Sequence, residues 1–325
     1  MRFVVFGAGA VGGVVAALLH EAGYDTVVIA RGNHLTALSD HGLTLASPEG
    51  RRIVPLTVRG TIAGLERRGD DIVLLTTKSQ DTHAAVEQIA EWSADVPVVC
   101  MQNGVANERT ALRRFPDTIG GVVMLPATFL QPGIVAAHST PTPGIIDVGR
   151  WPTGGDRTTG ELASCLRSAG FASRVVDDVA RWKYRKLLSN LSNVVDALSG
   201  AEARKGPVTD LAREEGLRSL DAAGIDHVPS AEDADRSGDL LNVCDAAGQP
   251  RQGSSTWQSL ARGVGTVETD YLNGEIVLLG RLHGVPTPVN AMLQRLAHAH
   301  MASGAPPGSM DASALLRRAE DAVRS

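Results

Sequence analysis

The glycine-rich stretch G-A-G-A-V-G at residues 7–12 constrains the fold of this chain more than any other feature. It follows an apolar, β-branched segment at 2–6 and opens a segment rich in small residues at 10–21, a pattern that predicts strand, turn and helix. A second apolar run at 26–30 predicts the next strand. Since two parallel strands need a crossover helix, we expect the chain to open with a β-α-β unit.

The glycine spacing matches G-x-G-x-x-G, the pattern of a dinucleotide-binding turn. Its three glycines serve a tight turn, the close approach of a pyrophosphate and the close packing of helix on strand. Backbone N–H groups and the positive end of the helix dipole then hold the phosphates. The residues predicted to contact the cofactor here are Gly7, Gly9, Ala10, Val11 and Gly12.

The same N-terminal run also imitates a signal peptide, because Arg2 precedes an apolar stretch that reaches Leu19. Four glycines interrupt that stretch, and residues 20–23 make a poor cleavage site. No later stretch reaches the ~18 continuous apolar residues of a membrane span. We therefore expect a cytoplasmic protein that does not enter a membrane.

Composition excludes several other classes. With 325 residues the chain is long enough for two domains, and its formal net charge of -5 does not favour nucleic acid as a partner. The three cysteines lie far apart and form no C-x-x-C pair, which argues against a disulfide scaffold or a zinc site. The scattered histidines do not predict a metal site either.

Strand and helix patterns alternate over the first half of the chain. Strands are expected at 71–76 and 96–101 with a helix at 81–92 between them, and shorter strands within 43–58, 118–125, 133–138 and 144–148. From residue 156 onward helical spacing dominates, at 158–168, 178–198, 208–223, 255–264 and 271–283. This predicts an α/β domain with a doubly wound sheet at 1–170 and an all-α domain at 171–325.

Arg31 follows the second predicted strand, where an NAD site would place Asp or Glu on the ribose hydroxyls. A guanidinium can bind a 2′-phosphate through two hydrogen bonds. The position therefore favours NADPH over NADH. The alternative is that Arg31 is a solvated loop residue.

Polar residues also follow the next predicted strands and line one predicted helix. Lys78 and Asn103 come directly after strands, although either could be an ordinary loop or turn residue. Lys186, Asn190 and Asn193 stand at i, i+4 and i+7, one face of a helix over 178–198. Either this face meets a polar substrate or it faces solvent while the neighbouring leucines are buried.

Two further residues have two interpretations each. Ser255 is either a helix cap or a hydroxyl that binds substrate, and Glu268 is either a surface carboxylate or the partner of an ammonium in a cleft.

Six motifs together resemble the ketopantoate reductase (2-dehydropantoate 2-reductase) family, from residue 3 to about residue 300. They are G-A-G-A-V-G, T-T-K at 76–78, Q-N-G at 102–104, K-L-L-S-N at 186–190, S-S-x-x-Q at 254–258 and E-T-D-Y-L-N-G at 268–274. The resemblance implies an N-terminal Rossmann domain, an all-helical C-terminal domain and a substrate cleft between them. It also implies NADPH-dependent reduction of a 2-oxo acid, with ketopantoate as the leading candidate.

The resemblance further assigns roles to residues of this chain. Lys186 corresponds to the general acid, Glu268 to the carboxylate that orients it, and Lys78 to a cofactor-side residue near the nicotinamide. The residues implied on the substrate are Asn190, Asn193, Ser255 and Asn103, the last of which also lies on the cofactor side.

Three departures from the family pattern concern the substrate half. Trp182 lies four residues before Lys186 instead of two, so Lys183 remains a rival for the acid. Asn193 stands one residue earlier than expected, and the interval before Glu268 is one residue longer. The alternatives are therefore a family member that reduces another keto acid or keto ester, or a non-catalytic NADP(H)-binding sensor.

The apolar run at 276–279 has two interpretations: it packs inside the protein, or it pairs two subunits of a homodimer.

Overall fold

The computed structural model describes residues 1–263 and 265–324, which form two compact units. Unit 1 consists of Met1–Lys183 and Pro229–Arg251, and unit 2 consists of Tyr184–Val228 and Gln252–Ser325. The strands all belong to unit 1, and the two units are described separately.

Unit 1 is built on a seven-stranded sheet with the order β12-β8-β7-β6-β1-β2-β5. Every neighbouring pair is parallel except β12 and β8. The chain passes from β1 to β2 on one side and then to β6 on the other, so the order reverses beside β1. The strands are β1 (Arg2–Phe6), β2 (Asp25–Ile29), β5 (Thr57–Arg59), β6 (Asp71–Leu75), β7 (Val98–Cys100), β8 (Thr118–Met124) and β12 (Ile145–Arg150).

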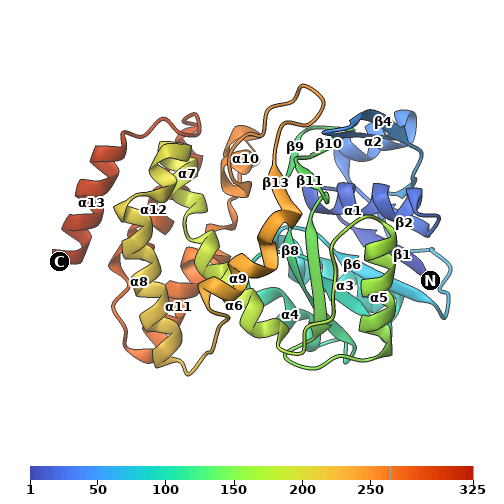
Figure 1. The fold of residues 1–325 in the computed structure, drawn as a ribbon, viewed down its shortest axis with the longest axis horizontal. Helices are drawn as coiled ribbons and strands as arrows, with labels where there is room; N and C mark the ends of the chain where they lie inside the picture. Colours follow the sequence, from blue (N-terminus) through green and yellow to red (C-terminus); the bar gives the residue numbers. More distant parts are fainter. Residues whose placement is uncertain (264, 325) are drawn as a thin grey trace. The chain divides into compact units, whose positions relative to one another are not determined.

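Helices cover both faces of this sheet (Figure 1). On one face α1 (Ala10–Glu21) and α5 (Arg157–Ser168) share an apolar core with Phe3 and Val5 of β1. On the other face α3 (Thr82–Trp92) and α4 (Ala106–Leu112) enclose Val4 and Phe6. Because β1 is covered on both faces, all five of its residues are buried, which explains the four consecutive apolar residues that follow Arg2.

Smaller elements complete unit 1. After α2 (Gly32–His41), a second sheet has the order β4-β3-β10-β9. Its strands are β3 (Leu43–Ser47), β4 (Gly50–Val54), β9 (Ala127–Gln131) and β10 (Ile134–Ala137). The segment Pro229–Arg251 carries α9 (Ser230–Ser237) and β13 (Leu241–Val243), and β13 pairs antiparallel with β11 (Ser139–Pro141).

An ion pair also ties the segment Pro229–Arg251 to the large sheet. Arg236 on α9 donates two hydrogen bonds of 2.7 Å to the fully buried carboxylate of Asp147 on β12. The segment Pro229–Arg251 follows a long stretch of unit 2 in the sequence, so its position along the chain does not indicate that it belongs to unit 1.

Unit 2 is helical (Figure 1). The unit boundary falls within α6 (Val179–Asn190), and the remaining helices are α7 (Asn193–Ser199), α8 (Pro207–Ala222), α10 (Ser255–Ala261), α11 (Asn273–His283), α12 (Pro288–Ser303) and α13 (Ala312–Arg324). The start of α12 is held by a buried carboxylate, since Glu215 accepts hydrogen bonds from the N–H groups of Val289 and Asn290 at 2.8 and 2.9 Å. Burial raises the pKa of Glu215.

The predicted fold class is confirmed: a sheet with helices on both faces is followed by a helical part. The division into units differs from the predicted line at 170/171, because the sheet unit extends to Lys183 and takes in Pro229–Arg251. The helix predicted over 178–198 is interrupted by a turn at Leu191 and Ser192, which separates α6 from α7. Of the helix predicted over 255–264, α10 covers Ser255–Ala261, and residue 264 lies outside the described residues.

Several helices and strands had not been predicted, namely α2, α4, α9, α12, α13, β9, β11 and β13. Within the described residues, none of the helices combines the length and the apolar character that crossing a membrane requires.

Candidate functional site

The glycine turn links β1 to α1 at the point where the strand order of the large sheet reverses. In open α/β sheets, ligands bind outside the carboxyl ends of the strands at such a point. Gly7 has φ +111°, a conformation that favours glycine. A Cβ at Gly12 would lie 1.9 Å from the Gly7 carbonyl oxygen and 2.4 Å from Thr76 Oγ1, so only glycine fits there.

The geometry of this turn fits a dinucleotide. A Cβ placed on Gly9 would have no heavy atom of the described residues within 4 Å, so the turn is open at the residue that precedes α1. The twelve-residue α1 has no acidic residue in its first turn, which leaves the positive end of its dipole uncompensated. An anion of the size of a pyrophosphate is therefore what this turn can bind.

The residues that follow β6 are fastened to the glycine turn. Thr76 donates its backbone N–H to the carbonyl of Phe6 at 3.1 Å and its hydroxyl to the carbonyl of Gly7 at 2.5 Å. Lys78, two residues later, is half-buried and directly precedes the 3-10 helix η1 (Ser79–Asp81). The structure thus places Lys78 on the same sheet edge as the glycine turn, as the sequence predicted for the ends of neighbouring parallel strands.

Asn103 belongs to a polar network that joins the loops after β6 and β7. Its carbonyl accepts hydrogen bonds from Asn107 Nδ2 at 2.8 Å and from Ser79 Oγ at 3.4 Å. Thr82 Oγ1 donates to Asn107 Oδ1 at 2.7 Å and accepts from Gln102 Nε2 at 2.9 Å. The backbone of Asn103 is therefore fixed by side chains from both loops, while its side chain is only partly buried.

Arg31 is the residue that directly precedes α2, and its side chain is 83% exposed. One guanidinium nitrogen lies 2.9 Å from Asp81 Oδ2 of η1. The carboxylate leaves most of the guanidinium accessible, and it also places a negative charge beside the position at which a 2′-phosphate would bind. Sequence reasoning had identified Arg31 but had missed Asp81, which lies fifty residues away in the chain.

Lys183, the other candidate for the general acid, forms a buried ion pair within unit 1. Its ammonium donates to the Gln102 carbonyl at 3.0 Å and to Glu108 Oε1 on α4. The Lys183 side chain is 2% exposed and that of Glu108 is fully buried. Burial raises the pKa of Glu108, and the neighbouring ammonium opposes that rise. A lysine held in this way does not present its proton to a substrate.

Lys186 and Asn190 lie one helical turn apart on the part of α6 that belongs to unit 2. Lys186 is half-buried and Asn190 is buried, so this face of the helix does not point freely into solvent. Asn190 Nδ2 is a buried atom for which the described residues provide no hydrogen-bond partner. A ligand with an oxygen acceptor would satisfy it.

The prediction that Asn193 continues this helical face is wrong, because α6 ends at Asn190 and Asn193 is the first residue of α7. The turn is tied by Ser192, whose hydroxyl donates to the Ser189 carbonyl at 3.0 Å. Asn193 nevertheless stays beside Asn190, since its Nδ2 donates to Asn190 Oδ1 at 3.4 Å. Its own Oδ1 accepts from Arg204 at 3.1 Å, a partner that the sequence did not indicate.

Ser255 is the first residue of α10, and its neighbour Ser254 provides the cap. Ser254 Oγ accepts the N–H of Trp257 at 3.3 Å and donates to the carbonyl of Asn193 at 2.9 Å. The Ser254 N–H in turn donates to Asp196 Oδ2 at 2.5 Å. Ser255 is therefore free of the capping role, and its Oγ is a buried atom without a hydrogen-bond partner among the described residues.

Glu268 opens the 3-10 helix η4 (Glu268–Tyr271) and is 3% exposed. The surface alternative for this carboxylate is therefore wrong. Its assignment as the partner of Lys186 stays a prediction.

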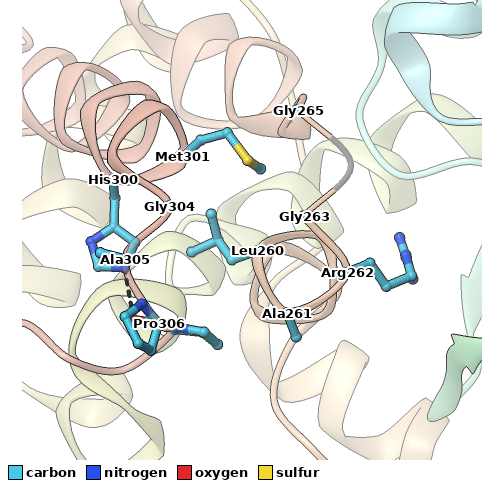
Figure 2. Close-up of a pocket in the computed structure, with 11 residues that line it drawn as sticks. Leu260, Ala261, Arg262, Gly263, Gly265, His300, Met301, Gly304, Ala305 and Pro306 are labelled. Atoms are coloured by element: carbon cyan, nitrogen blue, oxygen red, sulfur yellow. Dashed lines mark hydrogen bonds between the residues drawn. The ribbon is translucent and has the colours of Figure 1, made fainter.

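A hollow of about 530 Å³ lies elsewhere in unit 2, where α10 approaches the end of α12 (Figure 2). Leu260, His300 and Met301 line it, and His300 Nε2 donates to the carbonyl oxygen of Pro306 at 2.9 Å. None of the predicted site residues lines this hollow, so the candidate site is not placed there.

Two family models match the chain, "Ketopantoate reductase PanE/ApbA" over residues 3–153 and "Ketopantoate reductase PanE/ApbA C terminal" over residues 178–301. The 2-dehydropantoate 2-reductase of Archaeoglobus fulgidus is 31% identical, over 91% of this chain and 96% of that protein. The corresponding enzyme of Pyrococcus horikoshii is 27% identical, over 94% and 99%.

Solved structures agree with these matches. A PanE/ApbA family ketopantoate reductase from Ralstonia eutropha has a TM-score of 0.77 at 28% identity, over 94% of this chain and 99% of that chain. A ternary structure of D-mandelate dehydrogenase with NADH and anilino(oxo)acetate has a TM-score of 0.79 at 22% identity, over 94% and 100%, and shows the same fold. On its sequence and its fold, the chain belongs to the ketopantoate reductase family of NAD(P)-dependent oxidoreductases.

Proposed function

We propose that this protein uses NADPH to reduce a 2-oxo acid to a 2-hydroxy acid, with ketopantoate as substrate and pantoate as product. The observation that carries the proposal is the different environment of two neighbouring lysines on α6. The ammonium of Lys183 is held in a buried ion pair with Glu108, whereas Lys186 lies one turn further along the helix, followed one turn later by Asn190. The names of the curated relatives supply the substrate.

The cofactor assignment rests on the glycine turn and on Arg31. The turn suits the pyrophosphate, and Arg31 presents an exposed guanidinium directly after β2. A guanidinium there favours a 2′-phosphate over the free hydroxyls of NADH. Lys78 and Asn103, after β6 and β7, supply polar groups on the same sheet edge. NADPH, when bound, supplies the hydride.

The reduction requires a proton as well as a hydride. As the keto carbon accepts the hydride, its oxygen gains negative charge, and an ammonium within hydrogen-bond reach stabilises and then protonates it. We assign this proton to Lys186 Nζ, which is recharged from solvent. Asn190 Nδ2 and Ser255 Oγ, both buried without partners among the described residues, are the donors for the substrate's oxygens. The buried Glu268 is assigned to orient Lys186.

A substrate panel tests this function. The purified protein is assayed with NADPH and with NADH against ketopantoate, pyruvate, 2-oxoisovalerate and phenylglyoxylate. The proposal predicts the highest kcat/KM for ketopantoate with NADPH. A higher value for another oxo acid would identify a family member with a different substrate, and NADPH binding without oxidation on any oxo acid would identify a cofactor sensor.

A further inference from the structure

Both ring nitrogens of His34, on α2, take part in hydrogen bonds with the backbone. Nε2 lies 2.7 Å from the carbonyl oxygen of Ala8, and Nδ1 lies 2.9 Å from the backbone N–H of Gly133. Since the Gly133 N–H can only donate, Nδ1 must be the acceptor. The proton of the neutral ring is then on Nε2, which donates it to Ala8.

The surroundings of the ring favour this neutral form. Burial lowers the pKa of His34, and the Ala8 carbonyl opposes that shift only in part. Phe129 packs against the imidazole with ring centroids 4.6 Å apart. His34 is therefore fixed in one tautomer and in one orientation.

Ala8 is the second residue of the glycine turn, and its carbonyl belongs to the peptide plane that also contains the Gly9 N–H. In a trans peptide the C=O and N–H bonds point in opposite directions. A hydrogen bond that pulls the Ala8 carbonyl toward His34 therefore turns the Gly9 N–H away from it. Gly9 precedes α1 and is the position at which the turn is open.

We propose that His34 is a positioning residue for the cofactor, which orients the Ala8–Gly9 peptide so that the Gly9 N–H donates to the pyrophosphate. This inference rests on the proposed function, because it assumes that a dinucleotide binds at the turn. It assigns a part of the cofactor site to α2 and to the turn at Gly133, neither of which carries the glycine motif.

Two substitutions separate the two hydrogen bonds. In His34→Gln the side-chain amide can still donate to the Ala8 carbonyl, whereas in His34→Asn the shorter side chain can only replace Nδ1 as the acceptor for Gly133. The Kd for NADPH is measured by fluorescence, and kcat is measured with ketopantoate at saturating NADPH. Loss of one hydrogen bond corresponds to about fivefold in affinity, so we expect His34→Asn to raise Kd about fivefold, with His34→Gln near wild type and kcat unchanged in both.

His300 provides a matched control in unit 2, because its Nε2 also lies 2.9 Å from a backbone carbonyl, that of Pro306. The same pair of substitutions at His300 is expected to leave Kd unchanged. Equal values of Kd for His34→Asn and wild type would overturn the inference, as would equal losses in the Asn and Gln variants.

The wild-type protein separates this inference from the proposed function. If it binds NADPH but reduces no oxo acid, the function fails while the Kd values still test His34. If it binds no dinucleotide at all, both proposals fail.

Discussion

Lys183 of α6 and Glu108 of α4 form an ion pair from which water is almost entirely excluded, with the lysine 2% exposed and the glutamate fully buried. Removing one member leaves the other charge buried and alone, which typically costs about 3–5 kcal/mol. We expect Lys183→Met to lower the free energy of unfolding, measured with urea, by about that amount.

The double variant Lys183→Met, Glu108→Leu is the control for this pair. Because it leaves no uncompensated charge, its loss of stability should be smaller than the sum of the single losses, and it should approach wild type if the apolar side chains fill the space. Strict additivity would show that the two charges do not interact. A loss below about 1 kcal/mol in Lys183→Met would show that the lysine is not buried as described.

Lys186 is expected to carry the chemical step. Lys186→Ala removes the proposed proton donor, so kcat should fall by a factor on the order of 10² or more, while the Kd for NADPH stays near its wild-type value. Lys186→Arg keeps the charge without an easily released proton and should recover little of the rate. Turnover retained in Lys186→Ala would remove this residue from its assigned role.

Arg31 and Asp81 together are expected to set the choice between NADPH and NADH. Arg31→Ala removes the guanidinium, so the ratio of NADPH to NADH affinity should fall on the order of tenfold. Asp81→Asn removes the negative charge that lies 2.9 Å from that guanidinium, so the same ratio should rise. Parallel titrations with both cofactors check this, and a ratio unchanged in both variants would make Arg31 an ordinary surface residue.

Two glycines of the turn should respond differently to the same substitution. Gly12→Ala forces a Cβ to within 1.9 Å of the Gly7 carbonyl oxygen, so the thermal midpoint of unfolding should drop and cofactor binding should be lost. In Gly9→Ala the added Cβ has no heavy atom of the described residues within 4 Å beyond its own chain neighbours, so the thermal midpoint should stay near wild type while the Kd for the cofactor rises. A wild-type Kd in a folded Gly9→Ala protein would show that the pyrophosphate binds elsewhere.

The elements around the glycine turn could be predicted because local sequence determines them. The run of four apolar residues at 3–6 in β1, the small residues of α1 and the glycine at position 12 all indicate a helix packed closely on a buried strand. The sequence order also placed Lys78 and Asn103 at strand ends correctly, since the carboxyl ends of parallel strands share one edge.

Contacts between distant segments could not be predicted in this way. No residue near Lys183 in the sequence indicates that Glu108 will pair with it, and the family pattern alone left both Lys183 and Lys186 as candidates for the general acid. The break at Leu191 and Ser192 was missed because neither residue is a glycine or a proline. His34 was overlooked because its partners, Ala8 and Gly133, contribute only backbone atoms, which carry no residue-specific signal.

The return of the segment Pro229–Arg251 to unit 1 means that the chain passes between the two units three times. Neither unit is therefore a continuous stretch of the gene, and no single cut in the chain separates them. A ribosome releases β11 long before its partner β13 exists, so unit 1 reaches its full set of strands only after α6, α7, α8 and α9 have been synthesised. Loss or exchange of one unit during evolution would thus require matched changes at several junctions, which favours inheritance of the pair as a whole.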